Sequence, residues 1–573
     1  MKLILGINAH HADSSACLIE DGKVIAAIEE ERINRIKHFS GYPIEAIKEC
    51  LRLGKRKDLD ITDIAFNTKP LSNIVPKAYF YLKNFSIKKN QFSNRFSKKI
   101  FIKKTLFDNF NLNNSVKFHY VEHHLAHLAS AYFPSGFKKA VALSIDGSGD
   151  FVTFALANCK NGKINIFKKI LFPDSLGIFY HAMTQFLGFK NYGDEYKLMG
   201  LSAYGSPIYF EKILSNIFEE DKKNIFKLNL KFFNHQKKGF RYIADENLII
   251  DQIFNKNLDE LFKIELEKDK NQFLKDMASS VQKIYEYFFK KILNQITNYK
   301  ISKNIVFAGG CALNSSANKI LTEKNSDFDN IFIPFAPGDN GGCLGAAFVV
   351  SSKYNLELKN LKTPYLGNEF SKNELSDILN KYNLKGKISF ELLKNDETLY
   401  ASAAKLIADG NVIGWFQGKM EFGPRALGNR SILADPRNPN MKDIINMKIK
   451  RRESFRPFAP SVLSKFQKDW FEGNFDNPYM SSLATVKKNK RSLVPAITHI
   501  DGTARIQSVD SKNNQRYSSL LDFFFKLTGV PILLNTSFNE NEPIVFKPEH
   551  ALDCLLRTDM DAIFLDNYIV KRK

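Results

Sequence analysis

Paired cysteines and long apolar stretches are both missing from this sequence of 573 residues. The six cysteines are scattered, and no two form a Cys-x-x-Cys pair, which excludes a zinc ribbon and argues against a disulfide framework. No run of about 18 apolar residues occurs, so we expect no membrane-spanning helix and no membrane partner. The apolar start turns polar by Asn8, too early for a signal peptide, and we therefore expect the protein in the reducing cytoplasm.

The composition is that of a globular protein with more than one domain. Hydrophobic residues make up 44% of the chain, enough for cores, and the length exceeds that of one ordinary core. The formal net charge is +22 at pH 7. Because the lysines are mixed with many Asn, Phe and Ile residues, we expect no nucleic-acid partner, whereas small anionic substrates such as phosphates suit this charge.

Two stretches of the chain share one order of elements. Residues 2–28 predict three strands, with a polar Asp/Ser turn after the first and an Asp-Gly hairpin after the second. Residues 140–170 repeat this order, with the polar turn at residues 146–150 and an Asn-Gly hairpin. Such a repeat predicts duplicated subdomains whose polar turns hold a phosphate between them through backbone N–H groups. This is the arrangement shared by sugar kinases, actin and the heat-shock ATPases.

Residues 121–130, VEHHLAHLAS, hold two histidines four positions apart. On a helix, His123 and His127 lie on one face and can share a metal, although two polar residues at a core edge would look the same. Asp146 follows a buried strand, and Asp339 lies on a later glycine-rich turn. Two His and two Asp make a mixed N/O set suited to iron, zinc or manganese. No Glu follows His123, which excludes the usual metalloprotease motif.

Lys-rich segments lie between and after the two repeats. We expect helices and loops in residues 75–118 and a mostly helical insertion in residues 206–300, in which residues 273–296 have helical apolar spacing. A strand at residues 304–307 then leads into a Gly-Gly turn and a helix, an order that lets the backbone approach a nucleotide or phosphate.

Composition shifts over residues 354–370, and we place a domain boundary after residue 355. The second domain contains Arg425, Lys450, Arg456 and Arg505, and Pro424, Pro457 and Pro460 bracket arginines in these segments. Guanidinium forks and an ammonium suit phosphate and carboxylate oxygens, so these residues would form a cationic pocket. The alternative is that they are solvated surface charges of a basic protein.

Motifs along the whole chain point to one family. They are LGIN (5–8) with His10 and DSS (13–15), EEER (29–32) with KH (37–38), EHHLAH (122–127), DGSGD (146–150), KLMGLSAYG (197–205), GGCALN (309–314), GDNG (338–341), EFGPRALGNRS (421–431), RESFRPFAP (452–460) and LNTSFN (534–539). Together they resemble the motifs of the NodU/CmcH-type O-carbamoyltransferases.

The resemblance implies both a fold and a reaction. The fold is α/β, a duplicated actin/heat-shock-ATPase/sugar-kinase-type (TsaD-like) domain over residues 1–355, followed by an α+β YrdC-like domain over residues 356–573. The second domain would convert carbamoyl phosphate and ATP into carbamoyl-adenylate. The first would transfer the carbamoyl group to a hydroxyl of a sugar, sugar nucleotide or secondary metabolite. Fe(II) or another divalent metal is the implied cofactor, with ATP as co-substrate together with Mg²⁺. Base rates favour a homodimer.

The resemblance also implies the residues of both sites. The metal ligands would be His123, His127, Asp146 and Asp339. The ligands of carbamoyl phosphate and adenylate would be Arg425, Lys450, Arg456, Arg505, Asn535 and Ser537, with Lys450 and Arg456 also acting in catalysis. Contacts of substrate or nucleotide in the first domain are expected from Asp13, Ser14, Gly147, Lys197, Gly309, Gly310 and Asn314. The expected base that takes the hydroxyl proton is His10, with His11 as its rival.

Two other functions stay open at this point. A tRNA threonylcarbamoyl-transfer enzyme uses both fold types, and RNA binding would explain the positive charge. A nucleotide-binding protein of the actin or heat-shock kind, without transfer chemistry, would require the arginine group to be structural.

Overall fold

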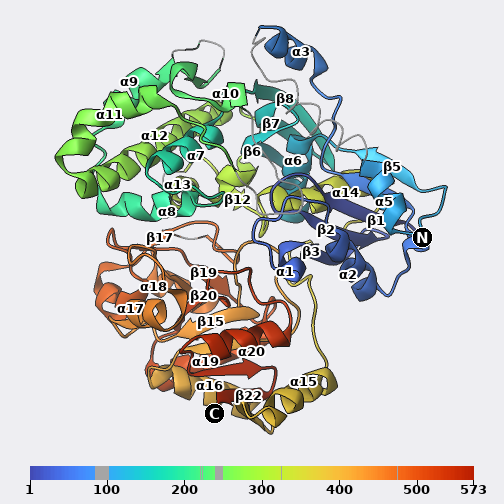
Figure 1. Ribbon diagram of the computed structural model, residues 1–573, viewed down its shortest axis with the longest axis vertical. Coiled ribbons are helices and arrows are strands. Elements are labelled where there is room, and N and C mark those ends of the chain that lie inside the picture. The colour runs from blue at the N-terminus through green and yellow to red at the C-terminus, as the bar shows by residue number, and fades with distance from the viewer. Residues whose placement is uncertain are drawn as a thin grey trace. The chain divides into compact units, whose positions relative to one another are not determined.

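The computed structural model of the chain describes residues 1–83, 102–219, 221, 224–238, 250–323, 326–359, 361–473 and 475–573. The chain divides into two compact units (Figure 1). The N-terminal unit comprises Met1–Leu321 and Asn325–Lys362, and the C-terminal unit comprises Thr322–Lys324 and Thr363–Lys573. Parts of the predicted segments 75–118 and 206–300 lie outside the described residues.

The N-terminal unit contains two five-stranded sheets of identical topology (Figure 1). The first has the order β3 (Lys23–Glu29), β2 (Ser15–Glu20), β1 (Leu3–Asn8), β4 (Asp63–Phe66), β5 (Lys117–Tyr120). The second has the order β8 (Lys163–Leu171), β7 (Val152–Lys160), β6 (Lys139–Gly149), β11 (Asn304–Ala308), β12 (Asn330–Phe332). In each, three strands joined by hairpins are antiparallel, and two further strands add in parallel beside the first of them. The predicted duplication, and the α/β fold class with it, is confirmed.

The second polar turn lies later than predicted. Strand β6 continues to Gly149 through an irregular register after Ile145, so the expected turn at residues 146–150 is mostly strand. The chain reverses at Asp150 and Phe151, which both have positive φ, 51° and 72°. Two such residues are typical of the tight hairpin turn that matches strand twist.

Two helices form the layer between the two sheets. Helix α6 (His123–Ser135) packs on β6 and β11, helix α14 (Gly342–Lys353) packs on β1 and β4, and the two helices pack on each other. Their contact is close because Gly345 has no side chain. A Cβ atom there would lie 1.9 Å from the backbone oxygen of Ala126, far inside van der Waals contact.

The remaining helices of this unit cover the sheets from outside. Helix α2 (Ile44–Gly54) packs on β2 and β3, and helix α7 (Leu176–Phe186) packs on β6. Helix α12 (Lys270–Asn298) contains the predicted amphipathic stretch and packs on α7. The others are α1 (Glu31–Asn34), α3 (Ile74–Lys83), α5 (Ile102–Asn109), α8 (Glu195–Leu201), α9 (Phe210–Ile217), α10 (His235–Lys238), α11 (Lys256–Lys268) and α13 (Ser315–Thr322), with two short strands, β9 (Phe218–Glu219) and β10 (Lys227–Leu228).

The C-terminal unit is built on one mixed eight-stranded sheet. Its order is β13 (Ile388–Leu392), β22 (Tyr568–Arg572), β21 (Ala562–Leu565), β14 (Ile413–Phe416), β15 (Arg430–Ala434), β20 (Ile532–Ser537), β16 (Ala459–Leu463), β19 (Gln507–Val509). Its helices are α15 (Lys372–Leu384), α16 (Asp396–Ala408), α17 (Met441–Ile445), α18 (Gln467–Trp470), α19 (Gln515–Thr528) and α20 (Pro548–Arg557), and β17 (Ala484–Thr485) pairs with β18 (Thr503–Ala504).

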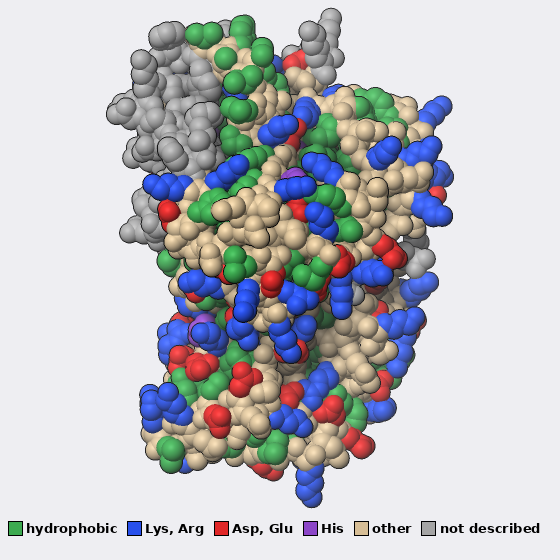
Figure 2. Space-filling model, turned by 90° about the vertical axis from the view of Figure 1, so that its right-hand side faces the viewer, with side chains coloured by type: hydrophobic (Ala, Val, Ile, Leu, Met, Phe, Trp, Pro, Cys, Tyr) green, Lys and Arg blue, Asp and Glu red, His purple; other side chains and the backbone are tan. Residues whose placement is uncertain are grey.

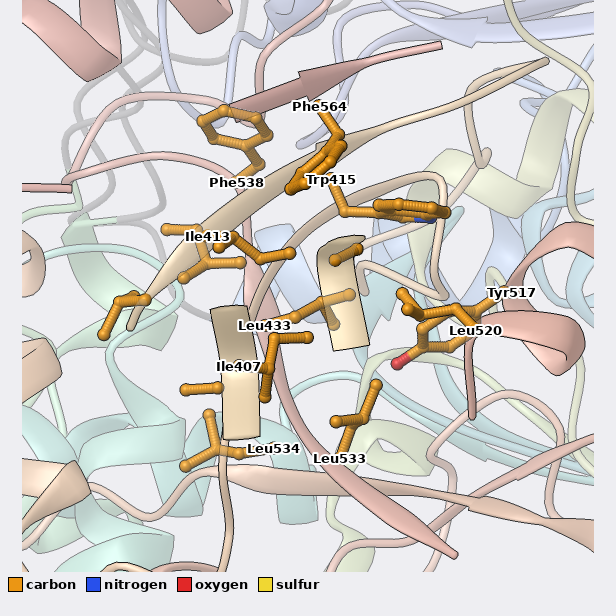
Figure 3. Packing of buried hydrophobic residues seen from close by; sticks show 14 of the residues in the cluster. Ile407, Ile413, Trp415, Leu433, Tyr517, Leu520, Leu533, Leu534, Phe538 and Phe564 are labelled. Carbon is orange, nitrogen blue, oxygen red and sulfur yellow. The ribbon is translucent and has the colours of Figure 1, made fainter. Parts of the chain in front are cut away.

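One continuous hydrophobic core holds this sheet to its helices. Trp415 is fully buried on β14 and packs beside Phe564 of the neighbouring strand, with ring centroids 5.9 Å apart (Figure 3). Ile407 of α16 and Leu520 of α19 belong to the same core, and α16 packs on α19. Burial of each such side chain contributes about 1.5–3 kcal/mol.

The surface is basic without being uniformly positive. Figure 2 shows Lys and Arg side chains spread over the visible face, with Asp and Glu among them. Among the described residues, no helix has both the length and the apolar character needed to cross a membrane.

We predict that Gly345→Ala destabilises the N-terminal unit by about 3 kcal/mol, because an added methyl group must push α14 away from α6. Urea unfolding followed by circular dichroism measures the loss. Lys353→Ala, at an exposed position of the same helix, is the matched control and should unfold like the unaltered chain. Equal unfolding midpoints for the two variants would contradict the close contact of α6 and α14.

Candidate functional site

The first turn of α6 is fixed by a carboxylate from the turn after β6. One oxygen of Asp150 accepts the backbone N–H groups of His123 (3.0 Å) and Lys69 (2.7 Å), and the other accepts the hydroxyl of Thr68 (2.9 Å). A helix N-terminus has N–H groups without intrahelical partners, and a negative charge there is favourable. Asp150 therefore determines where His123 begins the helix. No role was predicted for it, although an acid after a glycine-rich turn was visible in the sequence.

The structure brings the four predicted metal ligands together. His123 Nε2 lies 2.9 Å from His127 Nε2, 3.2 Å from Asp146 Oδ2 and 3.4 Å from Asp339 Oδ1. His127 Nε2 lies 3.4 Å from the same Asp339 oxygen and 3.9 Å from Asp146 Oδ2. The histidines come from α6, Asp146 from β6, and Asp339 from the turn before α14. We call these four residues the metal cluster.

The metal cluster fits a single cation. Around a tetrahedral ion with bonds of about 2.1 Å, neighbouring ligand atoms lie about 3.4 Å apart, close to the separations seen here. Asp339 Oδ1 is buried and has no hydrogen-bond partner among the described residues. Two imidazole and two carboxylate ligands suit iron, manganese or zinc.

Electrostatics also favour positive charge in the metal cluster. Although burial opposes protonation, the hydrogen bond of Asp146 and the charges of both Asp146 and Asp339 raise the pKa of His123 to about 10. The same contacts outweigh burial on the acids and hold the pKa values of Asp146 and Asp339 below their usual range. Two carboxylates thus create a place that prefers a cation.

Several glycines around the metal cluster allow close approach of the backbone and of the His123 ring. A Cβ atom on Gly149 would lie 2.0 Å from the ring of His123, so only glycine allows the ring to pass. Gly309 has φ of 93°, and a Cβ there would lie 2.2 Å from the carbonyl oxygen of Ile145. Gly310 donates its N–H to Asp146 Oδ1 at 2.8 Å. Gly309 and Gly310, predicted as nucleotide contacts, therefore position a carboxylate of the metal cluster.

The middle histidine of the motif has a different place. His124 Nδ1 lies 2.8 Å from the hydroxyl of Ser144, and its Nε2 lies 2.9 Å from the carbonyl oxygen of Val152. Burial and the neighbouring His123 lower its pKa to about 3, so the ring is neutral. It connects α6 to the second sheet and lies outside the metal cluster.

The loop after β1 lies against the metal cluster. The ring of His11 stacks on that of His123, with centroids 4.7 Å apart, whereas the ring of His10 packs edge-on against Tyr42 at 6.0 Å. Ser14 donates its hydroxyl to the carbonyl oxygen of Gly41 at 2.8 Å, which stabilises the loop. The structure therefore brings His11, and not the ring of His10, against a ligand of the metal cluster.

The other residues predicted in this unit have local roles. The Asp13 carboxylate lies 2.8 Å from His38 Nδ1. Lys197 forms an ion pair with Asp194 at 2.9 Å. Asn314 accepts the N–H of Ala317 at the start of α13, and it also donates to Gln282. The carbonyl oxygen of Gly147 accepts the hydroxyl of Ser175.

In the C-terminal unit, two buried charges shape the loop of residues 417–430. One oxygen of Glu421 accepts the backbone N–H groups of Leu427, Asn429 and Arg430, at 2.8, 2.7 and 3.1 Å. The fully buried guanidinium of Arg430 donates to the carbonyl oxygens of Asn368, Gln417, Gly418 and Asn429. Burial lowers the pKa of Arg430 to about 9. Both charges are thus satisfied by the backbone, and the loop that carries Arg425 is fixed.

Lys450 holds a second loop of this unit. Its ammonium donates to the carbonyl oxygens of Ser537 (2.6 Å) and Asn539 (2.7 Å) and to the side-chain oxygen of Asn539 (2.7 Å). Burial, followed by the charge of Arg452, lowers the pKa of Lys450 well below its usual value. Asn535 donates its amide to Ser461 and Gln507 in the sheet. Lys450 and Ser537, predicted as ligands of one substrate, therefore contact each other.

A group of arginines surrounds these loops, and we call Arg425, Arg452, Arg456 and Arg505 the arginine group. Burial lowers the pKa of Arg505 well below its usual value, and the charges of Arg425 and Arg452 lower it further. Arg505 Nε is buried and has no hydrogen-bond partner among the described residues. Arg452, for which no role was predicted, also packs over the ring of Phe458 at 4.4 Å. Arg456 pairs with Glu453 at 3.2 Å, and a group of like charges in one region suits a bound anion.

Comparison with known proteins gives a consistent result over both units. The family model described as "Carbamoyltransferase N-terminus" matches residues 3–348, and "Carbamoyltransferase C-terminus" matches residues 404–572. Protein sll1178 of Synechocystis sp. is 37% identical, and the match covers all of this chain and 97% of that protein. Nodulation protein NolNO of Sinorhizobium fredii is 35% identical, over 99% of this chain and 80% of that protein. Protein MJ1058 of Methanocaldococcus jannaschii is 32% identical over the full length of both.

These matches confirm the family that the motifs indicated. The chain belongs to the NodU/CmcH-type carbamoyltransferase family, and it is a carbamoyltransferase.

Proposed function

We propose that this carbamoyltransferase is ATP-dependent and works in two stages. The C-terminal unit hydrolyses carbamoyl phosphate with one water to carbamate and inorganic phosphate. A carbamate oxygen then bonds to the α-phosphorus of ATP and pyrophosphate leaves, which gives carbamoyl-adenylate. The N-terminal unit then transfers the carbamoyl group to a hydroxyl of a sugar, sugar nucleotide or secondary metabolite.

The arginine group is the observation that carries this proposal. Arg505 is partly buried beside Arg425 and Arg452, and the charges of Arg452 and Arg456 both act on Lys450. Such a set suits phosphate oxygens, which guanidinium groups bind with two parallel hydrogen bonds. Adenylate formation needs cations in this arrangement, because negative charge builds up on the pyrophosphate that leaves.

The need for activation follows from the chemistry of the carbamoyl group. Its nitrogen donates electrons to the carbonyl, which makes the carbon a poor target for an alcohol. A phosphate or adenylate on the same carbon supplies a good leaving group. Because the arginine group fits the first stage, the second stage falls to the N-terminal unit.

The metal cluster supports the second stage. His123, His127, Asp146 and Asp339 would hold Fe(II) or another divalent metal, which when bound supplies positive charge for phosphate oxygens or for the carbonyl oxygen. Asp150 keeps the two histidines at the start of α6. The stacked ring of His11 covers His123 and limits the access of water to it.

We predict that the full-length protein, given carbamoyl phosphate and ATP with Mg²⁺, forms pyrophosphate and inorganic phosphate without bicarbonate or threonine. Arg425→Gln should lower pyrophosphate formation by about 100-fold or more, the usual cost of removing one group that stabilises developing charge. A coupled pyrophosphate assay measures the rate.

Arg557→Gln is the matched control for this experiment. Arg557 is a half-exposed arginine of the same unit, paired with Glu540 and Glu542, and its loss should leave the rate unchanged. If the unaltered protein hydrolyses ATP to ADP and makes no pyrophosphate, the proposed function is wrong and a non-transferase ATPase is favoured.

A second prediction concerns the metal. Anaerobic incubation with Fe(II), followed by gel filtration and elemental analysis, should leave about one metal ion per chain, as four ligands in one cluster require. Asp339→Ala should abolish this binding. Bound metal should also raise the melting temperature of the unaltered protein and leave that of the variant unchanged, since a ligand of the folded state stabilises it.

His119→Asn is the control for metal binding. His119 lies in the N-terminal unit outside the metal cluster, paired with Asp63 at 2.7 Å, and its replacement should leave the metal content intact. Equal metal content in Asp339→Ala and the unaltered protein would contradict the assignment of the metal cluster.

A further inference from the structure

A second pair of polar groups lies beside the metal cluster. Asp13 follows two positions after His11, whose ring stacks on His123, so the loop that touches the metal cluster also carries Asp13. The carboxylate of Asp13 lies 2.8 Å from Nδ1 of His38. Both side chains are about a quarter exposed, 27% and 28%, so solvent and ligands reach the pair.

The backbone of His38 is held in place independently of this pair. Its N–H donates to Glu31 Oε2 at 2.7 Å, and the other oxygen of Glu31 accepts the Arg32 guanidinium at 2.6 Å. Each oxygen of Glu31 thus accepts one hydrogen bond, and the adjacent positive charge of Arg32 disfavours a further cation. This makes Asp13, Glu31 and His38 unsuitable as a second cation site and leaves the pair for another role.

The second ring nitrogen of His38 is open. No described residue accepts a hydrogen bond from its Nε2 or donates one to it. This Nε2 is also not one of the fully buried polar atoms that lack a hydrogen bond. It borders Gly193, where a Cβ atom would lie 2.7 Å from Nε2. Gly193 has φ of 83°, which itself favours glycine. Any side chain at this position would cover the nitrogen.

Tyr192 connects the pair to the metal cluster. Its ring packs edge-on against His38, with centroids 5.3 Å apart. Burial raises the pKa of its phenol well above the usual value, and the charges of Asp13 and Asp339 raise it further. Tyr192 is thus within electrostatic reach of both the pair and the metal cluster.

We propose that His38, oriented by Asp13, is the base that takes the proton of the acceptor hydroxyl; this inference depends on the proposed function. The acceptor oxygen bonds to the carbamoyl carbon, and the bond from that carbon to the phosphate oxygen of the adenylate breaks. AMP leaves with the bonding electrons, and the hydroxyl proton moves to His38 Nε2. Asp13 is the positioning residue.

The geometry distinguishes His38 from the two histidines predicted as the base. An imidazole that removes a proton needs one nitrogen held by an orienting group and the other directed at the hydroxyl. His38 meets the first condition through Asp13, and its Nε2, which has no partner among the described residues, would meet the second. The ring of His10 packs on Tyr42, and the ring of His11 is buried against His123.

The charges around His38 set the pH at which it can act. The groups that face it are Asp13, Glu31, Lys37, Tyr192 and Glu195. Although burial opposes protonation, the carboxylates of Asp13 and Glu31 raise the pKa of His38 above its ordinary value. Because the base works in its neutral form, the transfer rate should rise with pH through that pKa.

Water serves as the probe acceptor in the test. The full-length protein receives carbamoyl phosphate and ATP, and pyrophosphate and AMP are measured in the same samples. His38→Asn should keep the pyrophosphate burst of the first turnover and lower AMP release by about 100-fold or more, the usual contribution of general-base catalysis. Asp13→Asn should shift the rising limb of the pH profile of AMP release to lower pH, because the carboxylate that raises the pKa is gone.

His119→Asn is again the matched control, since His119 forms a similar pair with Asp63 at 2.7 Å in the same unit. It should leave AMP release and its pH profile unchanged. If pyrophosphate forms and His38→Asn, folded by circular dichroism, releases AMP at the unaltered rate, the inference is overturned while the proposed function stands. If no pyrophosphate forms, the result contradicts both the inference about His38 and the proposed function.

Discussion

The close contact between α6 and α14 is the constraint on which the N-terminal unit depends. Gly345 lets the backbone of α14 reach that of Ala126 on α6, and each helix packs on a different sheet. The histidines stand on α6, and Asp339 lies directly before α14. The distance between the two helices therefore sets the distance from the histidines to Asp339. The geometry of the metal cluster thus depends on how α6 and α14 pack in the core. A methyl group in the wrong place would affect both.

The C-terminal unit contains several buried positive charges, which must be stabilised within the folded protein. Arg430 and Glu421 are buried without pairing to each other. Glu421 accepts backbone N–H groups of this loop, and Arg430 donates to carbonyl oxygens of the loop and of Asn368. A buried charge without partners costs several kcal/mol, so this loop has one stable shape. Lys450 fixes the loop at Ser537 in the same way. These contacts fix the position of the loops beside the arginine group, which is the group assigned to phosphate in the proposed function.

The sequence predicted the fold better than the details of the site. The repeated order of three strands was visible because hairpin signals and runs of apolar residues are local features. The gathering of His123, His127, Asp146 and Asp339 is present in the structure as the motifs implied. Residues whose roles depend on distant backbone were not predictable. Asp150 acts on a helix N-terminus that precedes it by 27 residues, and nothing local to either segment encodes that contact.

The position of the metal cluster has a mechanical consequence. One side of it belongs to α6 and β6, which pack with the second sheet, and the other belongs to the segment that leads into α14 and the first sheet. A metal ion bound there would link the two halves of the duplicated unit, because its ligands come from both. A hinge motion between the halves would then change the lengths of the bonds to the metal, so the bound ion would oppose such a motion.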